Sequence, residues 1–146
     1  MNKLLFTFVV VFFLSLTAFS QQWQTNFEEA KKQASKNNEN IVLVFQGSDW
    51  CAPCIKLDKE IWSTETFKKL SQNHFVMLKA DFPRKKANKL SEEQTLQNSK
   101  LAEIYNHQGM FPLVVVLNKD GKVLGKTGYE KSNPSDYFKK LTSFEN

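Results

Sequence analysis

The feature that most constrains this chain is a pair of cysteines placed directly after a buried strand. The segment "IVLVFQ" is a run of apolar, β-branched and aromatic residues, which predicts a strand over about 41–45. Gly47-Ser48-Asp49 breaks this strand, and the only two cysteines of the chain, Cys51 and Cys54, follow in "WCAPC". Apolar residues recur at helical spacing after Cys54, so a helix is expected to begin at the cysteine pair.

Helices and strands alternate through the rest of the chain. "TNFEEAKKQASKNN" is expected to form a helix capped by Asn26, with Glu29 completing a capping box. Ser63 is expected to start a short helix, and "HFVMLKAD" a strand. "LAEIYNHQG" is expected to be a helix that ends at Gly109. The polar stretch 83–100 is predicted to be a loop with some helix.

The C-terminal part predicts a hairpin and a last helix. In "PLVVVLNKDGKVLGKTGY" two strands are joined around Asp120-Gly121, and Pro134 and Ser135 open the final helix. Helix and strand alternation of this kind predicts an α/β fold in which helices pack on a mixed sheet.

The first twenty residues differ from the rest of the chain. One early lysine precedes an almost unbroken apolar run that closes with Ala18-Phe19-Ser20, the pattern of a secretory signal peptide. The run is short for a membrane span, although an uncleaved N-terminal anchor is the alternative. We therefore expect a signal peptide over 1–20, cleaved near Ser20/Gln21, and one exported domain over 21–146. That domain would be periplasmic or secreted, with no stable membrane association after cleavage.

The charge of the chain gives little sign of a nucleic-acid partner. The formal net charge is +5, and the basic residues are spread along the sequence rather than gathered on one face. Acidic neighbours, Glu92 and Glu93, make the densest basic group a solvated surface rather than a nucleic-acid site. That group is Arg84, Lys85, Lys86 and Lys89.

Several kinds of site use closely spaced cysteines, and the sequence argues against most of them. A zinc site needs about four ligands, but the only histidines, His74 and His107, lie far apart, so no metal is expected. A c-type haem needs a histidine directly after the second cysteine, and Ile55 occupies that position. A structural disulfide across two residues closes a very small loop, which gives little chain-entropy stabilisation.

A redox couple gives each position a role. At the start of a helix the Cys51 thiolate faces unpaired backbone N–H groups and the positive end of the helix dipole, which lowers the pKa of the thiol. Cys54 lies nearly one turn later and is expected to be more buried, from where it can resolve a mixed disulfide. Pro53 is tolerated because first-turn N–H groups have no helical partner. Cys51 is thus the candidate nucleophile and Cys54 the candidate resolving cysteine.

Two separate motifs resemble the thioredoxin superfamily. They are "VLVFQGSDWCAPCIKL" and, some sixty residues later, "GMFPLVVVLNKDGKVLG", and together they cover essentially the whole mature chain. The resemblance implies a thioredoxin fold, a central mixed β-sheet flanked by helices. It also implies a cis Pro112 that faces the cysteines, and client binding by Trp50 and by the backbone of Phe111.

The active-site motif is most similar to exported bacterial members, including the C-terminal thioredoxin-like domain of the transmembrane disulfide reductase. Asp49-Trp50-Cys51 and Asp58 match that group. The family usually carries a buried aspartate before the first cysteine as proton acceptor for the second, but that position is Phe45, or Val44 if the loop has one extra residue. Asp58 is a candidate modulator of the cysteine pKa, solvent is the other substitute, and a plain surface carboxylate is the simpler interpretation of Asp58.

The direction of electron flow is also implied by the resemblance. Strongly oxidising members carry histidine before the second cysteine, whereas Pro53 stands there, as in reducing thioredoxins. This favours an exported reductase of protein disulfides, a role in cell redox homeostasis, over an oxidase or isomerase. No Gly-rich dinucleotide motif or other cofactor signal is present, so electrons are expected from a protein donor, membrane-embedded or otherwise.

Two other functions stay open at this point. The chain could be a non-catalytic binding module whose cysteines form a structural disulfide. It could also be a dedicated donor for one client, in cytochrome maturation or sulfoxide repair, with the polar stretch 83–100 as its specificity element.

Overall fold

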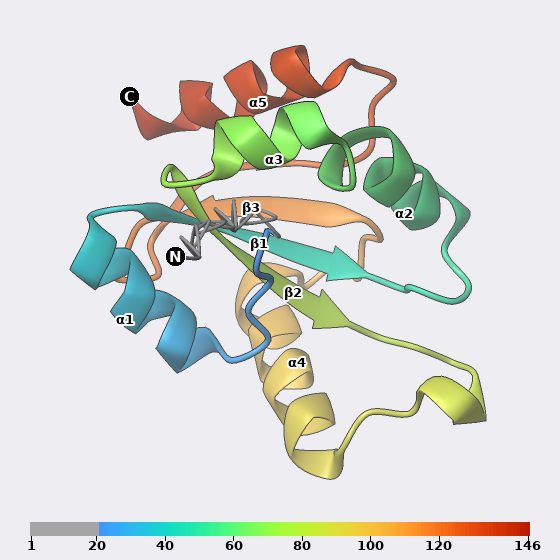
Figure 1. Cartoon of the computed structure of the whole chain (residues 1–146). Coiled ribbons are helices and arrows are strands. Elements are labelled where there is room, and N and C mark those ends of the chain that lie inside the picture. Colours follow the sequence, from blue (N-terminus) through green and yellow to red (C-terminus); the bar gives the residue numbers. More distant parts are fainter. Residues whose placement is uncertain (1–20) are drawn as a thin grey trace, which may run out of the picture.

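A four-stranded sheet lies at the centre of the computed structural model, which describes residues 21–146 (Figure 1). The strands are β1 (Asn40–Gln46), β2 (Phe75–Asp81), β3 (Leu113–Leu117) and β4 (Val123–Thr127), and their order across the sheet is β2-β1-β3-β4. β1 pairs in parallel with β2 and antiparallel with β3, and β3 pairs antiparallel with β4. The sheet is therefore mixed, as predicted.

Helices cover both faces of the sheet. α2 (Ala52–Leu57), α3 (Glu65–Ser71) and α5 (Pro134–Thr142) lie above it in the view of Figure 1, and α1 (Phe27–Asn37) and α4 (Glu92–Tyr105) lie below it. Three short segments complete the fold: a π turn, η1 (Asp58–Trp62), that continues α2, and two 3₁₀ turns, η2 (Lys86–Asn88) and η3 (Ser143–Glu145).

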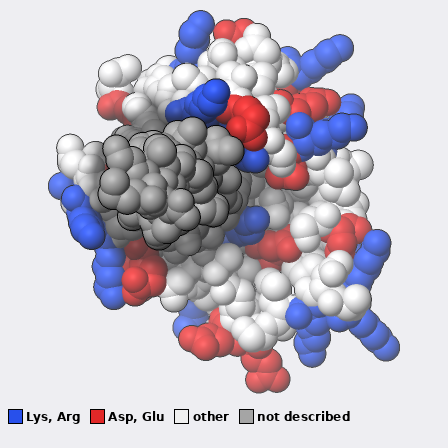
Figure 2. Space-filling model, viewed as in Figure 1, with Lys and Arg blue, Asp and Glu red and all other residues white. Residues whose placement is uncertain are grey.

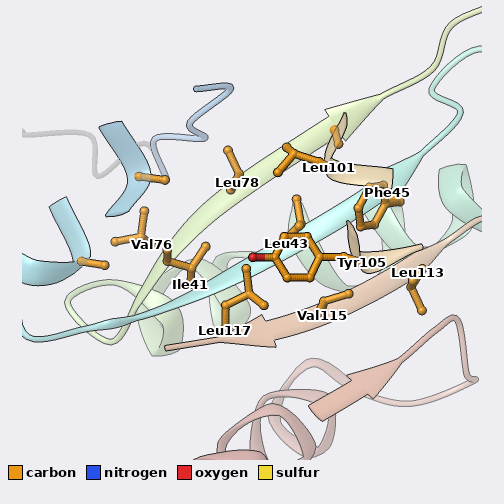
Figure 3. Packing of buried hydrophobic residues seen from close by; sticks show 13 residues of the cluster. Ile41, Leu43, Phe45, Val76, Leu78, Leu101, Tyr105, Leu113, Val115 and Leu117 are labelled. Atoms are coloured by element: carbon orange, nitrogen blue, oxygen red, sulfur yellow. The ribbon is translucent and has the colours of Figure 1, made fainter. Parts of the chain in front are cut away.

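Each face of the sheet has its own apolar core. On the side of α1 and α4, Ile41, Leu43 and Phe45 of β1 pack with Leu101 and Tyr105 (Figure 3). On the other side, the alternate residues of β1 pack against α2, α3 and α5. Because helices cover both faces, every residue from 41 to 45 is buried, which explains the unbroken apolar run in the sequence.

The Asn26 cap and the hairpin are confirmed, whereas the predicted capping box is not formed. The Asn26 side chain caps α1 by accepting the Glu29 N–H at 3.0 Å, although the Glu29 carboxylate pairs with Lys32 instead of closing the capping box. β3 and β4 form the predicted hairpin, and Gly121 in its turn has a φ of 87°, which favours glycine.

The polar stretch 83–100 contains loop and helix, as predicted, but the helix takes up more of it than expected. α4 begins at Glu92, where the Ser91 hydroxyl accepts the Gln94 N–H at 3.1 Å. The Gln97 side chain accepts the Phe27 N–H at 3.1 Å and donates to the Thr25 carbonyl at 2.6 Å, so polar side chains anchor this helix to the start of α1.

Two predicted helix ends also differ from the structure. α4 ends at Tyr105, because the Asn106 side chain bonds both backbone groups of Met110 and turns the chain; Gly109 lies in this following turn. α3 begins after Thr64, which caps it, rather than at Ser63. Ser63 instead closes the π turn, with its N–H donating to the Asp58 carbonyl at 2.8 Å.

The predicted signal peptide over 1–20 lies outside the described residues. Among residues 21–146, no helix has the length and apolar character that crossing a membrane requires.

Candidate active site

The two cysteines lie where the chain passes from β1 into α2, and they form a disulfide with a Cα–Cα distance of 5.2 Å. Cys51 is the N-cap of α2, and its Sγ accepts the N–H of Cys54 at 3.3 Å. The expectation that Cys54 is the more buried of the two is wrong, since Cys51 is 3% and Cys54 4% exposed. Both cysteines are buried when the bridge is closed.

A tight turn brings Cys51 to the start of the helix. The Cys51 N–H donates to the Gly47 carbonyl at 2.9 Å, and the Trp50 N–H to the same oxygen at 3.3 Å. A Cβ on Gly47 would overlap the Trp50 ring, so only glycine fits under this side chain. Pro53 occupies the first turn of α2, where its missing N–H leaves no bond unmade.

Trp50, Phe82 and Phe111 form an aromatic cluster beside the cysteine pair. The Trp50 ring lies 5.5 Å from that of Phe111, and the Phe111 ring 5.4 Å from that of Phe82, both edge to face. The Trp50 Nε1–H donates to the Phe82 carbonyl at 2.7 Å. The guanidinium of Arg84 stacks over Trp50 at 3.7 Å from the ring centroid. Trp50 and Phe111, expected together from the resemblance, are therefore in contact.

The Phe111–Pro112 peptide bond is cis, as the resemblance implies. Pro112 is buried at the start of β3, and β3 pairs antiparallel with β1, the strand that leads to the cysteines. Within residues 21–146, no backbone–backbone hydrogen bond uses Phe111.

The two cores show which residue, Val44 or Phe45, occupies the position where the family resemblance implies a buried aspartate. Val44 belongs to the core that contains Leu57 of α2, whereas Phe45 faces the opposite core. Val44 is therefore the strand residue beneath the active-site helix, and its side chain cannot titrate. Asp58 is exposed at the end of α2, where its N–H bonds the Cys54 carbonyl.

Two aspartates join the turn before the cysteines to the end of β2 and to the segment that follows it, and no sequence pattern predicted either role. The Asp49 carboxylate accepts the N–H groups of Arg84 at 2.9 Å and Lys85 at 3.0 Å, and the Asn88 side chain at 3.0 Å. The bond from the Arg84 N–H, followed by that from Asn88, holds the pKa of Asp49 below its usual range. The Asp81 carboxylate accepts the N–H and hydroxyl of Ser48 at 2.9 and 2.6 Å.

Asp49→Ala is expected to loosen the segment that contains Arg84 and Lys85. At neutral pH, hydrogen exchange at these two amides should be faster by about tenfold or more, as expected when one local set of bonds is lost. Because the pKa of Asp49 is lower in the folded protein than in the unfolded chain, its bonds stabilise the folded protein fully only at pH values above the unfolded pKa. This stabilisation is lost as the pH falls through the folded pKa. The difference between variant and wild type should therefore shrink in acid.

The matched control for this measurement is Asp120→Ala, which removes an exposed carboxylate from the β3–β4 turn. It should leave exchange at Arg84 and Lys85 unchanged. Equal exchange in wild type and Asp49→Ala at neutral pH would show that Asp49 does not hold the segment.

Over 21–146, no three side chains among histidine, cysteine, aspartate and glutamate are grouped so that they could hold a metal ion.

A family model and several known proteins are similar to most of the described chain. A family model described as thioredoxin-like matches residues 22–119. "Disulfide bond reductase DsbH" of Chlamydia pneumoniae is 34% identical over 128 residues, which are 88% of this chain and 75% of that protein. A solved structure titled "DsbH Oxidoreductase" has a TM-score of 0.78 at 34% identity, covering 86% of this chain and 84% of its own.

A more distant structure shares the fold alone. The oxidised C-terminal domain of DsbD from Neisseria meningitidis has a TM-score of 0.53 at 14% identity, covering 79% of this chain and 89% of its own.

Proposed function

Since the chain belongs to the thioredoxin-like family, we propose that it is an exported reductase of protein disulfides that works through Cys51 and Cys54. A Cys-x-x-Cys pair closed as a disulfide at the start of a helix is the arrangement of a thiol–disulfide oxidoreductase. The observation that carries the proposal is the Cys54 N–H directed at the Cys51 sulfur at 3.3 Å. In the dithiol form the same donor favours a thiolate on Cys51, which is the attacking species.

The reaction is two successive exchanges. The Cys51 thiolate attacks one sulfur of a client disulfide, so that a Cys51–client disulfide forms and the other client sulfur leaves as a thiolate that takes up a proton. Cys54 then loses its proton and attacks the Cys51 sulfur, which releases the second client thiolate. Two electrons pass to the client, and the Cys51–Cys54 disulfide is left.

The client would bind across Trp50 and the Phe111–Pro112 segment. The Phe111 backbone is unused by other backbone groups, and the half-buried Trp50 ring lies beside the cysteine that attacks. An extended client strand could pair with Phe111 while its disulfide meets Cys51. These positions are roles that we assign from the geometry and the family pattern.

The proton of Cys54 would leave by a route other than a buried carboxylate. Val44 beneath α2 is apolar, and Asp58, which directly follows α2, is exposed to water. We assign the proton to solvent, with Asp58 as a modulator of the local potential.

Three features support the direction and the compartment. Pro53, rather than histidine, precedes Cys54, which leaves the thiolate less stabilised and the dithiol a better electron donor. A relative that covers most of the chain is named a disulfide bond reductase. The N-terminal sequence has the pattern of a signal peptide. A reductase outside the cytosol must be recharged, and a membrane-embedded or other protein donor would supply the electrons.

The reduction potential of the Cys51–Cys54 couple tests this direction. Equilibration of the mature protein with defined thiol buffers should give a value near that of thioredoxin, roughly −270 mV. A value near −120 mV would show an oxidase instead. A pair that stays closed in glutathione and does not reduce a model disulfide would identify a binding module with a structural disulfide.

A further inference from the structure

A group of basic side chains lies next to the aromatic cluster of the active site. Figure 2 shows basic residues gathered at the lower right, over the segment between β2 and α4. Within residues 21–146, none of the ion pairs with an N–O distance of 4 Å or less involves a basic residue of this segment. The group, called here the basic segment, consists of Arg84, Lys85, Lys86 and Lys89, all exposed.

The basic segment is held against the site. The Asp49 carboxylate fixes the backbone of Arg84 and Lys85, and the Arg84 guanidinium stacks on the Trp50 ring, one residue from Cys51. Because these bonds fix the backbone, the cations lose less freedom when they meet a ligand. Arg84 is also the cation best suited to bind a carboxylate through two parallel bonds.

Among residues 21–146, the nearby acids form no direct ion pair with the cations of the basic segment. The Asp49 and Asp81 carboxylates accept their hydrogen bonds from backbone N–H groups, a hydroxyl and an amide side chain, and not from the basic side chains. Glu92 and Glu93 lie in the first turn of α4, where they stabilise the start of that helix.

A pocket of about 280 Å³ opens between the basic segment and α4. Phe82, Pro83 and Leu90 contribute apolar lining, and all four cations of the basic segment line it as well. Such a pocket suits an apolar side chain whose neighbours are acidic.

We propose that the basic segment binds an acidic stretch next to the disulfide of the client protein, and so selects clients with Asp or Glu near the reacting cysteines. This inference rests on the proposed reductase function. Charge complementarity next to a reacting centre raises the rate of productive encounter and rejects clients of like charge. An anionic membrane is the other partner that could attract cations, but Figure 2 shows acidic and basic side chains mixed over the rest of this face rather than a broad basic surface.

The test uses three disulfide peptides of one core sequence, flanked by Asp/Glu, Gln or Lys. At low salt, the reduced protein should show a kcat/KM about tenfold higher for the acidic peptide than for the Lys peptide. The preference should fall several-fold at high salt, because screening weakens exposed charge interactions. Equal rates for all three peptides would overturn the inference, while the reduction itself would still support the proposed function.

Charge reversal then locates the preference. For each variant, the acidic preference is the rate on the acidic peptide divided by the rate of the same variant on the Gln peptide. In Lys86→Glu/Lys89→Glu this ratio should fall about tenfold or reverse. Lys119→Glu/Lys122→Glu makes the same charge change in the β3–β4 turn, at the sheet end away from the cysteines, and should keep the preference. An equal loss of the preference in both variants would show that it depends only on the net charge of the protein, and would overturn the assignment to the basic segment.

Two further measurements cover the remaining outcomes. If no peptide is reduced, the proposed function fails, and fluorescence anisotropy of a labelled acidic peptide without cysteines still tests the inference. That peptide should bind the wild type several-fold more tightly than it binds Lys86→Glu/Lys89→Glu, and equal affinity would overturn it. Sedimentation with phosphatidylglycerol vesicles, combined with no peptide preference, would assign the basic segment to a membrane surface instead.

Discussion

Cys51→Ser is expected to lower the single-turnover rate of disulfide reduction by at least about a thousandfold, since it removes the nucleophile of a covalent reaction. The serine hydroxyl can still accept the Cys54 N–H that the Cys51 sulfur accepts in the structure, so α2 should keep its cap. The loss should therefore come from the chemistry rather than from unfolding. Stopped-flow mixing of the reduced protein with a model disulfide, together with a circular dichroism spectrum, checks both parts.

The resolving role predicts a different result for Cys54→Ser. Cys51 can still attack, but no second thiol completes the exchange, so the Cys51–client disulfide should accumulate. Non-reducing electrophoresis and intact mass should show one client per protein. Cys51→Ser/Cys54→Ser is the control and should trap none. Appreciable turnover in Cys51→Ser, or a client attached to Cys54 in that variant, would contradict the assigned roles.

Most of the fold could be predicted because its signals are local. The apolar run of β1, the Asn26 cap and the Asp120-Gly121 turn each depend on residues close together in the sequence, and each is confirmed. The start of α4 was missed because it depends on distant partners. Gln97 bonds Thr25 and Phe27, which lie about seventy positions away, and no pattern within the polar stretch predicts these bonds.

In the candidate site, too, the features set by local motifs could be predicted, and those set by distant contacts could not. The cysteine pair and the Phe111–Pro112 segment follow from motifs, so the sequence was sufficient to propose them. The contact of Arg84 with Trp50 joins residues 34 positions apart (84 minus 50) and depends on the Asp49 bonds that hold the segment in place. The choice between Val44 and Phe45 needed the sheet, since adjacent residues of a strand face opposite cores.

Trp62→Ala is expected to lower the free energy of unfolding by about 3–5 kcal/mol, the range for truncating a large buried aromatic side chain. Trp62 is 2% exposed at the end of the π turn that continues the active-site helix. Its ring lies 4.8 Å from that of Phe67 in α3, 5.4 Å from Tyr137 in α5 and 5.9 Å from Trp23. A single side chain therefore joins the active-site helix to both of its neighbours. Urea denaturation of the oxidised protein would measure the loss.

Two variants separate ring contacts from general effects of substitution. Trp62→Phe keeps an aromatic ring among the same partners and should lose clearly less stability than Trp62→Ala, because the cavity is smaller. Leu96→Ala truncates an α4 side chain that is 57% exposed, and should change the free energy of unfolding by less than about 0.5 kcal/mol. If Trp62→Ala costs no more than Leu96→Ala, the helices around the cysteine pair must be held by other contacts. A loss in the expected range would show that the contacts of Trp62, in the same core as Val44, hold the active-site helix in place.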